Sequence, residues 1–160
     1  YYLGAVKENP AFADAWYKLS ECSYKLEELD LAIQYLEKAE NLQRNKLEYK
    51  NLRGMIYVAM GKTEDAKKIF EDILKKYPND INAHFGLAEL ELLEGRVSGA
   101  EKQYNEALRR QTSNRKALLS LALVCAQRGQ FELALEYIKS GDFYEKSSSY
   151  RDGSHNTYRP

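Results

Sequence analysis

Few side chains in this sequence are of the types that perform catalysis or bind metal ions. The two histidines are His84 and His155, and the two cysteines are Cys22 and Cys125. Metal sites need such ligands a few residues apart, whereas these four residues form no Cys/His cluster. The sequence also has no glycine-rich phosphate loop and no nucleophile elbow. We therefore predict no catalytic residues, no metal site and no cofactor, and conclude that the protein is not an enzyme.

The neighbouring carboxylates, which could perform acid–base catalysis, have a structural explanation. Glu27 is followed by Glu28, and Glu64 by Asp65, at the expected starts of helices. Acidic side chains interact favourably with the helix dipole at such positions. His84 stands where a large packing residue is expected, so we predict that it packs between helices.

The cysteines and the first residues give little information about compartment. Cys22 and Cys125 are expected to be buried free thiols that pack as small hydrophobic residues, with a disulfide as the less favoured alternative. The first ten residues have no initiator Met, no basic start and no long apolar run. We interpret the sequence as a piece of a longer protein whose targeting signal could lie outside it. The compartment is left open, with the cytoplasm slightly favoured.

The composition suits a helical protein and argues against two kinds of partner. Only 3 of the 160 residues are proline, which helix interiors tolerate least. The 24 basic side chains are balanced by 24 acidic ones, so no surplus of positive charge is available for nucleic acid. No stretch approaches the roughly 20 apolar residues that cross a bilayer, so membrane insertion is not expected.

A period of 34 residues runs through the sequence. One column contains only alanine, a second contains small residues twelve positions earlier, and a third contains large apolar residues four positions later. Small residues allow two helices to cross closely, because larger side chains would overpack the contact. Each unit is therefore predicted to be a pair of amphipathic helices joined by a tight turn. The columns are Ala32, Ala66, Ala100 and Ala134; Ser20, Gly54, Ala88 and Ala122; and Leu36, Phe70, Tyr104 and Ile138.

The second unit shows the two helices best. The first is expected at about Leu47–Ala59, and the second from Thr63 to about Lys76. Gly61, which recurs at the same interval in the two later units, can adopt the left-handed conformation that ends a helix. Thr63 is expected to be the N-cap of the second helix.

These columns resemble the tetratricopeptide repeat, whose 34-residue signature places Trp, Leu-Gly, Tyr, Ala, Phe and Pro at fixed positions. The resemblance implies an all-α fold, a right-handed α-α superhelix in which antiparallel helical hairpins stack as a solenoid. A pentatricopeptide array, which reads RNA, is disfavoured by the strict 34-residue period and the balanced charge. Residues that match the signature include Trp16, Leu19 and Ala32 in the first unit, and Gly54, Tyr57, Ala66, Phe70 and Pro78 in the second.

The resemblance also sets the domain boundaries. Residues 1–12 are expected to end a preceding repeat, and residues 13–46, 47–80, 81–114 and 115–141 to form four repeats, the last incomplete. Residues 142–160 are predicted to be an irregular tail or linker, because they show no helical stripe. The alternative is that aromatic residues of this tail pack back onto the repeats, namely Phe143, Tyr144, Tyr150 or Tyr158.

By resemblance, the first helix of each repeat lines a concave groove. The groove is expected to be acidic toward its amino-terminal end and more apolar beyond it, which suits an amphipathic helix or extended peptide of a partner. Many of its side chains could instead pack between neighbouring helices. The predicted lining residues are Tyr17, Glu21, Tyr24, Asn51, Met55, Val58, Phe85, Glu89, Leu92, Leu119 and Leu123.

These features predict a non-catalytic scaffold that binds a protein or peptide partner. Chaperone-binding members of the family grip a C-terminal carboxylate with basic residues, and the corresponding positions here are not basic. One alternative is a structural module that self-associates through its repeat ends, and another is the regulatory arm of a larger multidomain protein. Replacing Phe85 with glutamate is expected to abolish partner binding while leaving the helices intact.

Overall fold

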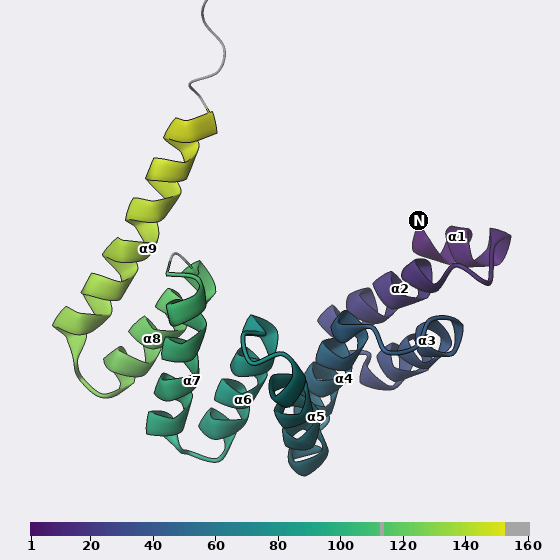
Figure 1. Ribbon diagram of the computed structural model, residues 1–160, viewed down its shortest axis with the longest axis horizontal. Coiled ribbons are helices and arrows are strands. Elements are labelled where there is room, and N and C mark those ends of the chain that lie inside the picture. Colours follow the sequence, from purple (N-terminus) through teal and green to yellow (C-terminus); the bar gives the residue numbers. More distant parts are fainter. Residues whose placement is uncertain (113, 153–160) are drawn as a thin grey trace, which may run out of the picture. The chain divides into compact units, whose positions relative to one another are not determined.

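The structure is a computed structural model that describes residues 1–112 and 114–152, with side chains described as far as residue 141. Within these residues it consists of α-helices without any strand, so the all-α fold is confirmed (Figure 1). The helices are α1 (Tyr2–Glu8), α2 (Ala13–Lys25), α3 (Leu29–Leu42), α4 (Leu47–Ala59), α5 (Thr63–Lys76), α6 (Ile81–Leu93), α7 (Val97–Arg110), α8 (Arg115–Gln127) and α9 (Phe131–Asp152).

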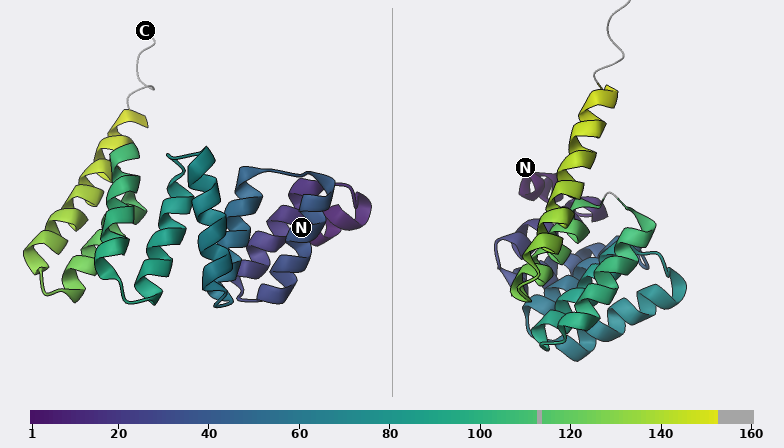
Figure 2. Two further views of the ribbon diagram at one scale, coloured as in Figure 1. Left: turned by 60° about the horizontal axis from the view of Figure 1, so that its bottom comes forward. Right: turned by 90° about the vertical axis from the view of Figure 1, so that its left-hand side faces the viewer.

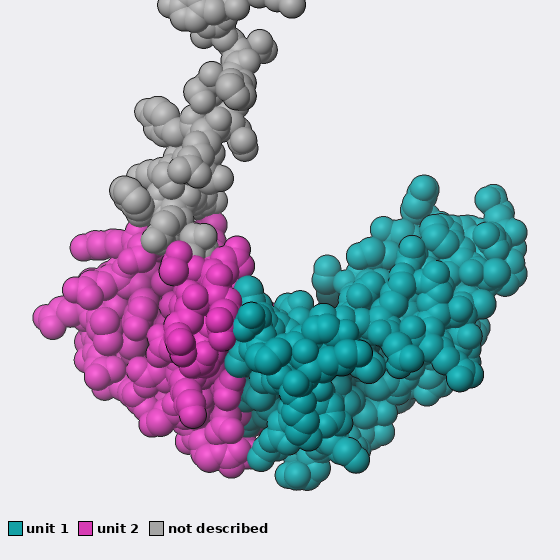
Figure 3. Space-filling model, viewed as in Figure 1, with its two compact units in different colours: residues 1–90 teal, residues 91–160 magenta. Residues whose placement is uncertain are grey.

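The chain divides into two compact units, residues 1–90 (unit 1) and residues 91–160 (unit 2), which Figure 3 colours separately. In unit 1, α2 packs against α3 and α4 against α5 as antiparallel hairpins, and α3 packs against α4 (Figure 2). In unit 2, α7 packs against α8, and α8 forms a hairpin with α9.

Apart from Ile138, the residues of the three columns are buried. The alanines of the first three hairpins are completely buried, as the predicted close crossing requires. Leu36 packs against Tyr49 and Ile56 of the following α4, so the second hairpin covers the apolar face of the first. Phe70 is covered in the same way by α6, within unit 1.

The turns inside the hairpins follow the same 34-residue repeat as the helices do. Gly61 has a φ of 73°, which lies in the left-handed region. The prediction that Gly61 adopts this conformation where the first helix ends is therefore confirmed. Thr63 is not the N-cap of α5, because the carbonyl oxygen of Lys62 already accepts a hydrogen bond from the backbone N–H of Ala66. The N-cap is Lys62, and its side chain makes no capping hydrogen bond.

The structure differs from the sequence-based prediction over residues 142–152. These residues continue α9 as a helix, whereas an irregular tail was expected from residue 142. No proline interrupts the chain between Phe131 and Asp152, so nothing forces the helix to end earlier. The proposed folding back of Phe143, Tyr144, Tyr150 or Tyr158 concerns side chains outside the described ones.

The histidine and cysteine predictions have mixed outcomes. His84 is buried, and its Nε2 atom lies 3.1 Å from the carbonyl oxygen of Pro78, so its packing role is confirmed. Both cysteines are free, and Cys125 is buried. The prediction that Cys22 is buried is wrong: its side chain is exposed, and the buried residues of α2 are its neighbours Leu19, Ser20 and Ser23 together with Ala13 and Ala15.

Candidate functional site

The predicted groove residues of α2 are half-buried and interact with neighbouring side chains. The Tyr17 ring stacks on Tyr49 of α4, with 5.0 Å between the ring centroids. Burial, and next the neighbouring Glu21 carboxylate, raise the pKa of Tyr17 well above its usual value. The tyrosine hydroxyl also hydrogen-bonds to Glu21, so it remains a neutral donor at physiological pH.

The acidic charge expected at this end of the groove is partly neutralised by two lysines. Lys18 forms an ion pair with Glu21, with Nζ 2.6 Å from the carboxylate oxygen. Lys46, just before α4, lies 3.0 Å from Asp14 and 4.0 Å from Glu48. These pairs leave little net negative charge to select a basic ligand.

The side chain of Asn51 on α4 is buried and has a structural role. Its Nδ2 donates a hydrogen bond to Oδ1 of Asp80, 3.1 Å away. The same carboxylate oxygen accepts a hydrogen bond from the backbone N–H of Ala83, 2.7 Å away, at the start of α6. Asn51 therefore connects α4 to the cap of α6, and its side chain is almost completely buried.

The apolar groove residues of unit 1 belong mainly to the core. Val58 is buried and Met55 is half-buried in the cluster around Phe70. Phe85 is 6% exposed, so a glutamate there would bury a charge and destabilise α6. The expectation that Phe85→Glu leaves the helices intact is therefore not supported, and this variant cannot test partner binding selectively.

Tyr24 and Glu89 are predicted groove residues that come together in unit 1. Tyr24 lies at the end of α2 and Glu89 on α6, and both are half-buried. Burial and then the negative charge of Glu89 raise the pKa of Tyr24 above its usual value.

The exposed apolar part of the predicted groove lies in unit 2. Leu119 and Leu123 stand one turn apart on α8 and are 46% and 61% exposed, whereas Leu92 is half-buried. The two exposed leucines line an open depression of about 430 Å³ together with Ser120 and the basic residues Arg115 and Lys116. We call this surface the α8 patch. It offers aliphatic contact area beside two positive charges.

The described residues contain no group of three or more histidine, cysteine, aspartate or glutamate side chains arranged to hold a metal ion. None of their helices is both long and apolar enough to cross a membrane.

Comparison with known families identifies the fold. The model of the tetratricopeptide repeat matches residues 1–45, 51–115 and 94–145, which is most of the chain. The chain belongs to the tetratricopeptide repeat family. No curated protein matches its sequence. Arrays of this kind stack repeats into extended binding surfaces, and the family generally serves as a non-catalytic interaction scaffold.

Solved tetratricopeptide structures superimpose well despite low sequence identity. A thermophilic repeat protein of Thermus thermophilus has a TM-score of 0.76 at 21% identity, covering 88% of this chain and 77% of that one. A repeat protein of Parabacteroides merdae reaches 0.81 at 16% identity, covering 88% and 55%. The type IV pilus biogenesis factor PilW reaches 0.71 at 21% identity, covering 91% and 67%. These likenesses show the shared tetratricopeptide fold.

The sequence analysis missed the lysines that change the electrostatics of this tetratricopeptide array. Lys18 precedes Glu21 by three residues on a helix, a spacing that signals an ion pair. Lys46 and Asp14 are 32 residues apart, almost one repeat, so only the stacking of successive hairpins brings them together. A search for opposite charges one repeat apart would have found this pair.

Proposed function

We propose that the protein is a non-catalytic scaffold that binds an amphipathic helix or extended peptide of a partner protein through the α8 patch. The observation that supports this proposal most directly is the exposure of Leu119 and Leu123 side by side on one face of α8. Isolated exposed leucines are ordinary, but an apolar depression rimmed by charge is typical of interaction sites.

The partner's affinity comes from burying these leucines. Fully burying one leucine side chain contributes about 1.5–3 kcal/mol, so losing one such contact weakens binding about tenfold to a hundredfold. The positive charges of Arg115 and Lys116 favour a partner with acidic residues next to its apolar face.

A matched pair of variants tests this proposal. Leu123 is 61% exposed and Leu26, at the end of α2, is 69% exposed, so a glutamate at either position faces solvent. We expect proteins captured by the wild-type chain to be lost with Leu123→Glu and retained with Leu26→Glu. Equal capture by both variants would show that the α8 patch does not bind the partner.

A second candidate function, self-association, is favoured by the outer face of α9. Ile138 is 38% exposed, whereas the equivalent Leu36, Phe70 and Tyr104 are buried under a following helix. Phe131 and Leu135 lie on the same face of α9 and are also exposed. A helix of a second copy could cover this stripe as the internal helices are covered.

Sedimentation equilibrium over a range of concentrations separates the two functions. Self-association predicts a dimer or larger species that Ile138→Lys dissociates and Leu26→Glu does not. A chain that remains monomeric at all concentrations would contradict the second candidate and leave the α8 proposal unaffected.

A further inference from the structure

Within unit 1, the hairpin of α4 and α5 contains a pocket that is separate from the α8 patch. Its volume is about 230 Å³. A cavity of about 150 Å³ accommodates benzene, so this pocket has room for one aliphatic or aromatic side chain. It is lined by Lys50, Arg53, Ile69, Asp72, Ile73, Lys76 and Tyr77.

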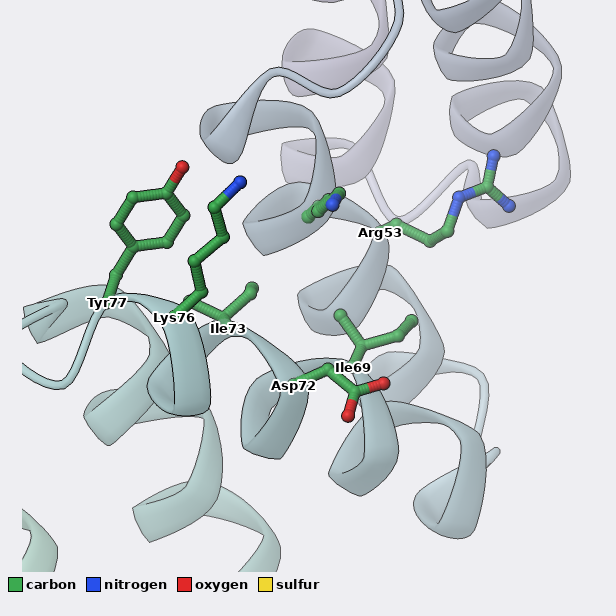
Figure 4. A pocket seen from close by; sticks show the side chains of 7 residues that line it. Arg53, Ile69, Asp72, Ile73, Lys76 and Tyr77 are labelled. Carbon is green, nitrogen blue, oxygen red and sulfur yellow. The ribbon is translucent and has the colours of Figure 1, made fainter.

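The floor of the pocket is apolar and its wall is aromatic. Ile73 is buried and Ile69 is half-buried, and both lie along α5 between the charged side chains (Figure 4). At the end of α5, Lys76 and Tyr77 project side by side in Figure 4, with the lysine Nζ 5.4 Å from the centroid of the tyrosine ring. The pocket can therefore bury an apolar side chain and contact a polar group at its edge.

The charges of the pocket do not cancel. Arg53 extends away from Lys76 in Figure 4 and pairs with Glu40 of α3, with 3.1 Å from Nε to Oε1. Asp72 pairs with Lys75, 3.0 Å away. Among the described residues, no carboxylate forms an ion pair with Lys50 or Lys76, so the rim retains two positive charges.

Lys50 also lines a neighbouring, more polar depression. That depression has a volume of about 280 Å³ and is formed by the end of α3 and the start of α4. Arg44 and Lys46 lie in it beside Lys50. Lys46 already pairs with Asp14, and Glu40 also lines the depression, so a bound segment that passes Lys50 would meet Arg44 as the further basic side chain there.

From this geometry we propose that the pocket between α4 and α5 binds an acidic peptide segment that carries one large apolar side chain. The apolar side chain enters over Ile69 and Ile73, and flanking carboxylates pair with Lys50 and Lys76. The site lies in the other unit from the α8 patch and does not depend on it. A nucleic acid is a poorer match, because it lacks an aliphatic group for the apolar floor.

Fluorescence anisotropy with the full chain tests this proposal. The probe is a fluorescein-labelled, C-amidated peptide of sequence Glu-Glu-Ser-Phe-Glu-Glu, which carries one large apolar side chain, measured at low and at physiological ionic strength. We expect saturable binding that weakens with salt, because its ion pairs lie at the surface. The same peptide with Gln for every Glu, or with Ser for Phe, should bind at least several-fold more weakly.

Charge-reversal variants locate the site. Lys50→Glu and Lys76→Glu replace attraction by repulsion at exposed positions, so each should weaken probe binding about fivefold to tenfold without unfolding the chain. Lys102→Glu makes the same charge change at an exposed position on α7 and should leave the affinity unchanged. Circular dichroism of each variant confirms that the helices are retained.

Three outcomes would overturn the proposal. The first is no saturable binding of the probe by the wild-type chain, and the second is unchanged affinity in both Lys50→Glu and Lys76→Glu. The third is stronger binding of a single-stranded oligonucleotide that displaces the probe. Leu123→Glu should leave probe binding intact, so failure of this site and failure of the α8 patch are distinguishable.

Discussion

The hydroxyl group of Ser20 on α2 donates a hydrogen bond to the carbonyl oxygen of Ala32 on α3, with 2.7 Å between the two oxygen atoms. Both residues are completely buried. They belong to the small-residue column and the alanine column, so this contact is the close helix crossing that the 34-residue period predicts.

Ser20 provides the first test of this crossing. Ser20→Ala removes one buried hydrogen bond and should lower the free energy of unfolding by about 0.5–1.5 kcal/mol. Ser20→Val adds volume at the crossing and should cost a further 1–3 kcal/mol or so. Urea unfolding followed by circular dichroism measures both changes, and a valine variant as stable as the alanine variant would contradict the packing argument.

Gly86 on α6 tests the packing of the second hairpin. Its Cα faces the ring of Phe70, and an added Cβ would overlap the ring atoms. Gly86→Ala should therefore lower the free energy of unfolding by about 1–3 kcal/mol, despite the better helix propensity of alanine.

Gly4→Ala is the matched control, because an added Cβ in α1 meets no atom within 4 Å. It should be neutral or slightly stabilising. In a Phe70→Leu background, which relieves the overlap, Gly86→Ala should lose most of its effect. An equal loss in both backgrounds would show that Phe70 is not the cause.

The repeat and its helices were predictable because they depend on local spacing. The bounds of α4 agree with the sequence-based prediction, since the small columns mark the crossing of the two helices and Gly61 marks the turn between them. The end of α9 was not predictable in this way. The lack of a helical apolar stripe after Gly141 suggested an irregular tail, but only a helix-breaking residue would have required one.

The candidate site was harder to predict than the fold. Periodicity shows which face of a helix is apolar, but not whether that face meets a neighbouring hairpin or solvent. On α6, buried residues such as Ala83, Phe85 and Ala88 lie around most of the helix, so position alone could not show that Phe85 belongs to the core. On α8, the same repeat position holds Leu119, which is exposed.

The two thiols should differ in reactivity. Cys22 is exposed, whereas burial raises the pKa of the Cys125 thiol, with a smaller contribution from Glu101. A thiol reagent such as Ellman's reagent should modify Cys22 rapidly and Cys125 only slowly in the folded chain. In denaturant, both should react at the same rate. Rapid double modification without denaturant would contradict the burial of Cys125.

The raised pKa of Cys125 also makes stability depend on pH. The unfolded thiol ionises at its ordinary pKa of about 8.5, while the folded thiol remains protonated. The unfolded state then binds fewer protons, so the stabilisation present below that pKa is lost as the pH rises toward the folded pKa. Urea unfolding of Cys22→Ser, which retains only Cys125, should therefore show a decline over this range. Cys22→Ser combined with Cys125→Ala should show a smaller decline.

Glu27 stands in the first hairpin at the position that glycine occupies in the other three. Its φ of 62° lies in the left-handed region, close to the 73° of Gly61. A residue with a Cβ pays roughly 1–2 kcal/mol for this conformation, and glycine avoids that cost. Glu27→Gly should therefore raise the free energy of unfolding by about 1 kcal/mol, since the added freedom of glycine in the unfolded chain offsets part of the gain. Glu28→Gly, at the next position where φ is −82°, relieves no strain and should give no such increase. Urea unfolding of the two variants decides the point: equal stabilities would mean that the left-handed turn at Glu27 carries no strain.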